Sequence, residues 1–182
     1  VTLGTFLLWF GWFGFNGFSQ LAMGTFDDVN AISKIAVNTH LAGAAGTVAA
    51  AVVTRLLGGK TDIVMMLNGA LAGLVAITAE PLTPSPVLAI VIGAIGSLIM
   101  YFGTKFLESK KIDDVVGAIP VHMFAGIFGT LVVPISNPDT NFGTQLTGVI
   151  AVCLFSFILS YITFRVLKQT IGLRISAQAE KL

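Results

Sequence analysis

The dominant feature of the sequence is a series of long stretches that contain no Asp, Glu, Lys or Arg. These stretches are residues 1–26, 35–54, 63–79, 81–104, 115–138 and 140–164. A helix needs about 20 apolar residues to cross the hydrocarbon core of a bilayer, and each stretch approaches or exceeds that length. The stretches lack the alternation of apolar and polar residues that is typical of membrane-spanning strands. The sequence therefore predicts an all-α membrane protein with six transmembrane helices.

Composition supports this class and excludes others. Only 10% of the 182 residues are charged and 55% are hydrophobic, whereas a soluble domain carries about 25% charged residues. The formal net charge of +1 leaves no basic face for phosphates, so we expect no nucleic-acid partner. Cys153 is the only cysteine, which excludes an intrachain disulfide and a metal-thiolate site. We predict no cofactor and no metal.

The charges in the connections indicate the orientation. If successive connections alternate sides, one side receives nearly all of the basic residues: Arg55, Lys60, Lys105, Lys110, Lys111, Arg165, Lys168, Arg174 and Lys181. The other side receives Lys34 alone. Positively charged connections stay on the cytoplasmic side of cell membranes. We therefore expect residues 1–168 to form the membrane domain, and the even-numbered loops and the tail 169–182 to be cytoplasmic.

His122 is the most informative single residue, because it lies inside an uncharged apolar stretch. Ionisable side chains within membrane helices are rare and usually face a bundle interior or an aqueous path. Helical spacing predicts that Ala118, Ala125, Gly126 and Gly129 share its face, which leaves space beside the imidazole or allows close helix packing. The sequence thus predicts a functional site at His122.

Acidic and breaker residues surround the start of the same helix. Asp113 and Asp114 are expected to cap the helix N-terminus rather than to bind an ion. Pro120 cannot donate a backbone hydrogen bond, so it should free the carbonyl near Val116 and kink the helix below His122. Pro134 should act in the same way near the other end.

The first stretch is unusually aromatic. Trp9 and Trp12 lie near its middle rather than at an interface, which predicts that both pack inside the protein. Gly11, Phe15 and Ser19 are four residues apart and share one helix face. A hydroxyl next to an aromatic ring can hold a small, partly desolvated cation. The alternative is that Phe15 only packs and that the Ser19 hydroxyl bonds to its own helix.

Several motifs, taken in order, resemble those of the ammonium transporter (Amt/Rh) family. They are Gly11-Trp-Phe-Gly-Phe-Asn16, Val37-Asn-Thr39, the run from Asn68 to Thr78, Asp113-Asp114 with Gly117-Ala-Ile-Pro-Val-His122, and Gly172-Leu-Arg174. The resemblance covers essentially the whole chain. It matches the second half, helices six to eleven, of the family's eleven-helix fold. We therefore expect this chain to be part of a longer one, whose N-terminal half supplies the facing wall of the pore.

The resemblance implies roles for particular residues. The family forms homotrimers, and each subunit has its own narrow pore between two halves related by an inverted repeat. Phe15 resembles one of two stacked phenylalanines that gate the outer vestibule, and Ser19 resembles the hydroxyl that helps to recruit ammonium there. His122 resembles one of the two pore histidines, and Thr78 matches a position near the pore wall. The partner histidine, the partner phenylalanine and the recruiting tryptophan belong to the first half.

Two regions fall outside this correspondence. His40 does not occupy the family's pore position, so we interpret it as a packing or interface residue. In the tail, Ala177 and Gln178 stand where the family usually has an acidic pair. Contact with a cytosolic regulatory protein, which the family's tail often mediates, is therefore left open.

The resulting hypothesis is a transporter of ammonium, or of methylammonium, and not an enzyme. Ammonium would be held at the outer mouth by Ser19 and the aromatic rings, lose its proton and pass His122 as ammonia. A first alternative is a sensor that uses the same core to report ammonium to an output domain. A second is a membrane redox protein in which His40 and His122 ligate haem.

Overall fold

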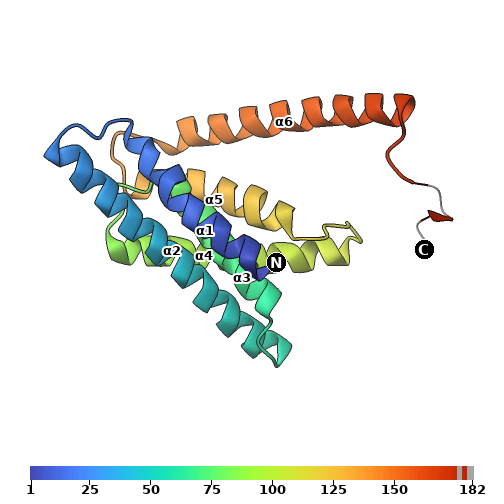
Figure 1. The fold of residues 1–182 in the computed structure, drawn as a ribbon, viewed down its shortest axis with the longest axis horizontal. Coiled ribbons are helices and arrows are strands. Elements are labelled where there is room, and N and C mark those ends of the chain that lie inside the picture. The colour runs from blue at the N-terminus through green and yellow to red at the C-terminus, as the bar shows by residue number, and fades with distance from the viewer. Residues whose placement is uncertain (176–177, 180–182) are drawn as a thin grey trace. The chain divides into compact units, whose positions relative to one another are not determined.

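The computed structural model describes residues 1–175 and 178–179, and its regular structure within these residues is entirely helical. Figure 1 shows six α-helices: α1 (Thr2–Gly17), α2 (Phe26–Gly58), α3 (Ile63–Thr78), α4 (Pro86–Ser109), α5 (Ala125–Val132) and α6 (Phe142–Thr170). Three short helical segments join them: η1 (Phe18–Gln20), η2 (Ile119–Phe124) and η3 (Val133–Ile135). The prediction of an all-α protein is confirmed. The chain divides into two compact units, residues 1–145 and 146–182.

Helix length and hydropathy are those of a membrane protein. Among the described residues, α2, α4 and α6 are each long and apolar enough to cross a bilayer. The helix α3 and the continuous segment Ile119–Ile135 are shorter and also apolar. The chain is therefore a multi-pass membrane protein.

Helix ends differ from the ends of the charge-free stretches. The first helix stops at Gly17, and the chain then turns at Leu21, which adopts a left-handed φ of 60°. The second helix begins at Phe26 because Thr25 and Asp28 form a capping box. The charged residue Asp28 therefore lies within α2. The absence of charge indicates which residues lie in apolar surroundings, but it does not indicate where the helical backbone begins or ends. Similarly, η2 begins only at Ile119.

The centre of the first unit is a three-helix core in which α2, α3 and α4 approach closely through glycines. A side chain on Gly73 or Gly93 would overlap the backbone of Ala42, and one on Gly46 would overlap the backbone of Gly69. Small residues at such crossings allow backbones to come into contact. These glycines therefore allow the close packing of the three helices.

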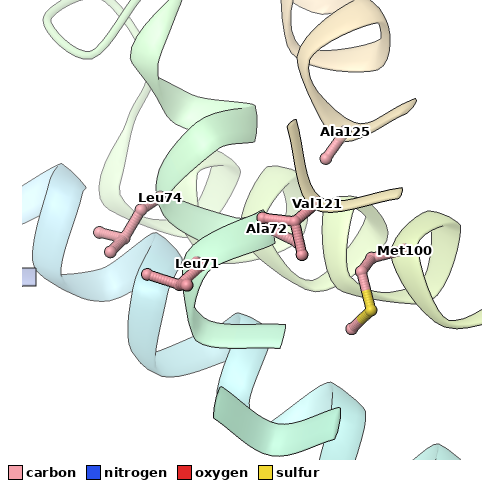
Figure 2. Close-up of a cluster of buried hydrophobic side chains, with 6 residues drawn as sticks. All are labelled: Leu71, Ala72, Leu74, Met100, Val121 and Ala125. Atoms are coloured by element: carbon pink, nitrogen blue, oxygen red, sulfur yellow. The ribbon is translucent and has the colours of Figure 1, made fainter. Parts of the chain in front are cut away.

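A second cluster of buried side chains connects α3 and α4 to η2 and α5. It consists of Leu71, Ala72, Leu74, Met100, Val121 and Ala125, which Figure 2 shows as sticks. Trp9 and Trp12 of α1 pack against the cluster, as predicted for tryptophans in mid-helix. The helix α3 thus contacts both α1 and η2. This arrangement positions the two halves of the candidate site.

Candidate functional site

The end of α1 presents Phe15 and Ser19 on the surface of the first unit. The Phe15 side chain is 66% exposed, and its ring centroid lies 6.0 Å from that of Trp12. Ser19 is exposed in η1, and its hydroxyl makes no hydrogen bond to any residue of the described part. The alternative, in which the Ser19 hydroxyl bonds to its own helix, is therefore not observed among the described residues. Both side chains are accessible to a ligand or to a facing protein surface.

Thr78 is joined to this aromatic pair by a hydrogen bond. The indole Nε1 of Trp12 donates to Thr78 Oγ1 at 2.7 Å, and Thr78 Oγ1 donates to the carbonyl of Leu74 at 2.7 Å. The bond ties α1 to the last turn of α3. Trp12 was expected to be buried but was not predicted as a site residue, because nothing in the sequence pairs it with a residue of another helix. Phe15, Trp12 and Thr78 are thus connected by one ring contact and one hydrogen bond, and these three residues form the wall of the candidate site.

Replacement of Trp12 by phenylalanine should test this wall. The Trp12→Phe variant keeps an aromatic ring but loses the donor, so the free energy of unfolding should fall by about 1 kcal/mol more than packing alone explains. Trp9→Phe is the matched control, since the Trp9 indole nitrogen has no hydrogen-bond partner among the described residues and both rings pack on the same cluster. Thermal unfolding in detergent measures both variants, and equal losses would contradict the role assigned to the bond.

His122 lies in η2, which is a π-helical turn. Its side chain is exposed and makes no hydrogen bond or ring contact with the described residues, whereas its neighbour Val121 is 2% exposed. The predicted common face is partly wrong. Ala118 is exposed and Gly126 is partly exposed, as His122 is, but Ala125 and Gly129 are buried. A π-turn contains an extra residue, which rotates the following positions relative to an α-helix.

The start of the His122 helix is capped by one of the two predicted carboxylates. Asp114 Oδ1 accepts a hydrogen bond from the Ala118 amide at 2.9 Å, and Asp114 Oδ2 accepts one from the Ile119 amide at 2.8 Å. These bonds confirm the capping role of Asp114. Asp113 takes part in neither of them. These bonds satisfy two N–H groups at the start of the helix that lack a helical acceptor.

His40 contacts aromatic side chains of α1. Its ring is stacked on Phe13, with centroids 6.2 Å apart and an interplanar angle of 18°, and lies 5.6 Å from the Trp9 ring. These contacts join α2 to α1. They support the interpretation of His40 as a packing residue and give it a different environment from that of His122.

The amino-acid sequence matches the family model described as the Ammonium Transporter Family over residues 1–182. Among curated relatives, the ammonium transporter Amt2 of Archaeoglobus fulgidus is 40% identical over 200 residues, which cover 99% of this chain and 42% of that protein. A putative ammonium transporter of Synechocystis is 39% identical over 185 residues, which cover 100% of this chain and 42% of that protein.

Solved structures show the same relationship. A structure described as a sensor Amt protein aligns with a TM-score of 0.90 and 37% identity, covering 99% of this chain and 46% of that one. Mep2 of Candida albicans aligns with a TM-score of 0.86 and 26% identity, covering 97% and 43%. The chain thus spans less than half the length of these relatives. On its motifs, its helical fold and these matches, the chain belongs to the ammonium transporter family.

Proposed function

We propose that this chain forms one wall of a passage that moves ammonium across a cell membrane. The observation that carries the proposal is the His122 imidazole, which is exposed and unbonded within the described residues of an apolar helical segment. An ionisable group in such a segment typically serves an ion or proton path. Relatives of this chain are named ammonium transporters, which supports ammonium as the substrate. Methylammonium is a second candidate.

The physical argument for a histidine is the cost of carrying a charge through the membrane. An ammonium ion at the centre of a bilayer is destabilised by several kcal/mol, at least about 2.5 even on the mildest scales for charged groups. Neutral ammonia avoids most of this cost. An imidazole suits the passage of ammonia and a proton, because one ring nitrogen donates while the other accepts. His122 would therefore contact the neutral base while the proton follows its own relay.

The wall formed by Phe15, Trp12 and Thr78 would act before His122 along this path. Ser19 has a free hydroxyl that can accept a hydrogen bond from ammonium, and the exposed Phe15 ring can attract the cation through its π face. Deprotonation at this position would leave ammonia to continue past the imidazole. This order of events requires that Ser19 lies on the outer side of the membrane and that the tail lies in the cytoplasm. The distribution of basic residues favours the same orientation.

The facing wall and the assembly complete the proposal. We infer that the second wall comes from a preceding half of the same protein, and that three copies assemble into a homotrimer. The side chains of Phe15, Ser19 and His122 are exposed in this chain, which supports a second protein surface that faces them. A cytosolic regulatory partner would act through the tail, where Ala177 lies outside the described residues and the acidic pair is missing.

A sensor is the second candidate function, because one solved relative is described as a sensor Amt protein. The test is the electric current evoked by ammonium from the intact protein in liposomes on a solid-supported membrane. A transporter gives a sustained charge movement that depends on ammonium concentration, and we expect this result. Binding of ammonium without such a current would contradict transport and favour the sensor. Liposomes without protein and a sodium pulse serve as controls.

A further inference from the structure

Asn68 occupies a position that the mechanism does not use. It lies in α3, is 7% exposed, and its Nδ2 atom donates a hydrogen bond to the backbone carbonyl of Val116 at 3.1 Å. That carbonyl lies before the helix, because η2 begins at Ile119 and the intervening Gly117 has a φ of +75°. It is therefore out of register with the backbone N–H groups of the helix. The Asn68 amide provides its hydrogen-bond donor instead.

The neighbouring hydrogen bonds are made within the same segment of the chain. The amide of Ile119 bonds to the Asp114 side chain, and the amide of Val121 bonds to the carbonyl of Gly117 at 3.2 Å. The carbonyl of Val116, in contrast, accepts its hydrogen bond from Asn68 of another helix. Asn68 is consequently the link between α3 and the first turn that leads to His122.

Gly117 makes this approach feasible. Its φ of +75° is strained for residues with a side chain, and a Cβ atom there would lie 2.7 Å from Asn68 Nδ2. The glycine therefore provides both the backbone turn and the space for the amide. The left-handed glycine and the hydrogen bond from the buried asparagine together specify the path of the chain into η2.

The direction of His122 depends on that path. The amide of Ala125 bonds to the carbonyl of Pro120, five residues earlier, so the turn that contains His122 holds one residue more than an α-helical turn. Each residue of a helix rotates its side chain by about 100°. A change in where η2 begins therefore redirects the imidazole relative to the buried Val121.

We propose that Asn68 is a positioning residue for His122, acting through the carbonyl of Val116. This inference rests on the proposed function, in which the direction of the imidazole matters for transport. Loss of one such hydrogen bond shifts the balance between the positioned and the displaced turn by about fivefold. The Asn68→Leu variant has a side chain of similar size without a donor, and it should show this change.

The test compares Asn68→Leu with Asn68→Gln, which keeps an amide donor. The readout is the ¹⁵N resonance of the His122 ring in the intact protein in lipid, with His40 as an internal reference. We expect Asn68→Leu to shift the His122 signal and to lower the ammonium-evoked current by up to about fivefold. Both effects should be smaller in Asn68→Gln.

Equal effects of Asn68→Leu and Asn68→Gln, or an unchanged His122 signal in Asn68→Leu, would overturn the positioning role. A shifted His122 signal with an unchanged current would support positioning and contradict the proposed function of the histidine. If Asn68→Leu does not fold, Asn68→Gln should fold with a His122 signal close to that of the wild type, and its failure to do so would also overturn the inference.

Discussion

Gly73→Ala is expected to destabilise the protein severely, although it adds only one methyl group. The new Cβ atom would overlap the carbonyl of Ala42 and approach the backbone of Gly46, so α2 and α3 would have to move apart. Backbone atoms cannot rotate away as the end of a side chain can. Overpacking of this kind costs about 3 kcal/mol, which corresponds to a fall of about 6–12 °C in the unfolding temperature for a chain of this size.

Gly4→Ala is the matched control for this experiment. Gly4 also lies in a helix, but a Cβ atom there has no neighbour within 4 Å. Alanine has the higher helix propensity, so this variant should be as stable as the wild type or more stable by up to about 1 kcal/mol. Thermal unfolding followed by circular dichroism compares the two. Similar unfolding temperatures for both variants would contradict the close contact between α2 and α3.

Local rules were sufficient for much of the fold. The charge-free stretches predicted that the chain is helical. The Asp114 cap followed from the hydrogen-bonding capacity of the backbone alone. Pro120, in contrast, does not kink a helix but lies in the first turn of η2, where no helical hydrogen bond is lost. The burial of Trp9 and Trp12 followed from their distance from an interface. Each of these features depends on residues that are near one another in the sequence, or on the apolar surroundings that all the helices share.

Features that depend on contacts between helices could not be predicted in this way. The bond from Trp12 to Thr78 joins α1 to α3, and the bond from Asn68 to Val116 joins α3 to the turn before η2. Nothing near these residues in the sequence identifies their partners. The π-turn at His122 is another example, because a regular 3.6-residue period placed Ala125 on the wrong face. An extra residue in a turn leaves no mark in the hydrophobic pattern.

The candidate site combines both kinds of information. Phe15, Ser19 and His122 were identified by motif and spacing, and the structure leaves all three side chains exposed on the first unit. Thr78 was identified by resemblance alone, and it acquires a physical role through its bond to Trp12.

The central claim is that His122 lies on the path of the transported species, and replacing it by alanine in the intact protein tests this directly. Current evoked by ammonium on a solid-supported membrane should be abolished in His122→Ala, because no other described side chain of η2 can exchange a proton. The matched control is His40→Ala, which removes the same chemical group from a packing position between α1 and α2 and should keep its current. Equal amounts of folded protein are required in each liposome preparation. Wild-type current in His122→Ala would contradict the account, and its loss with the current of His40→Ala retained is the predicted result.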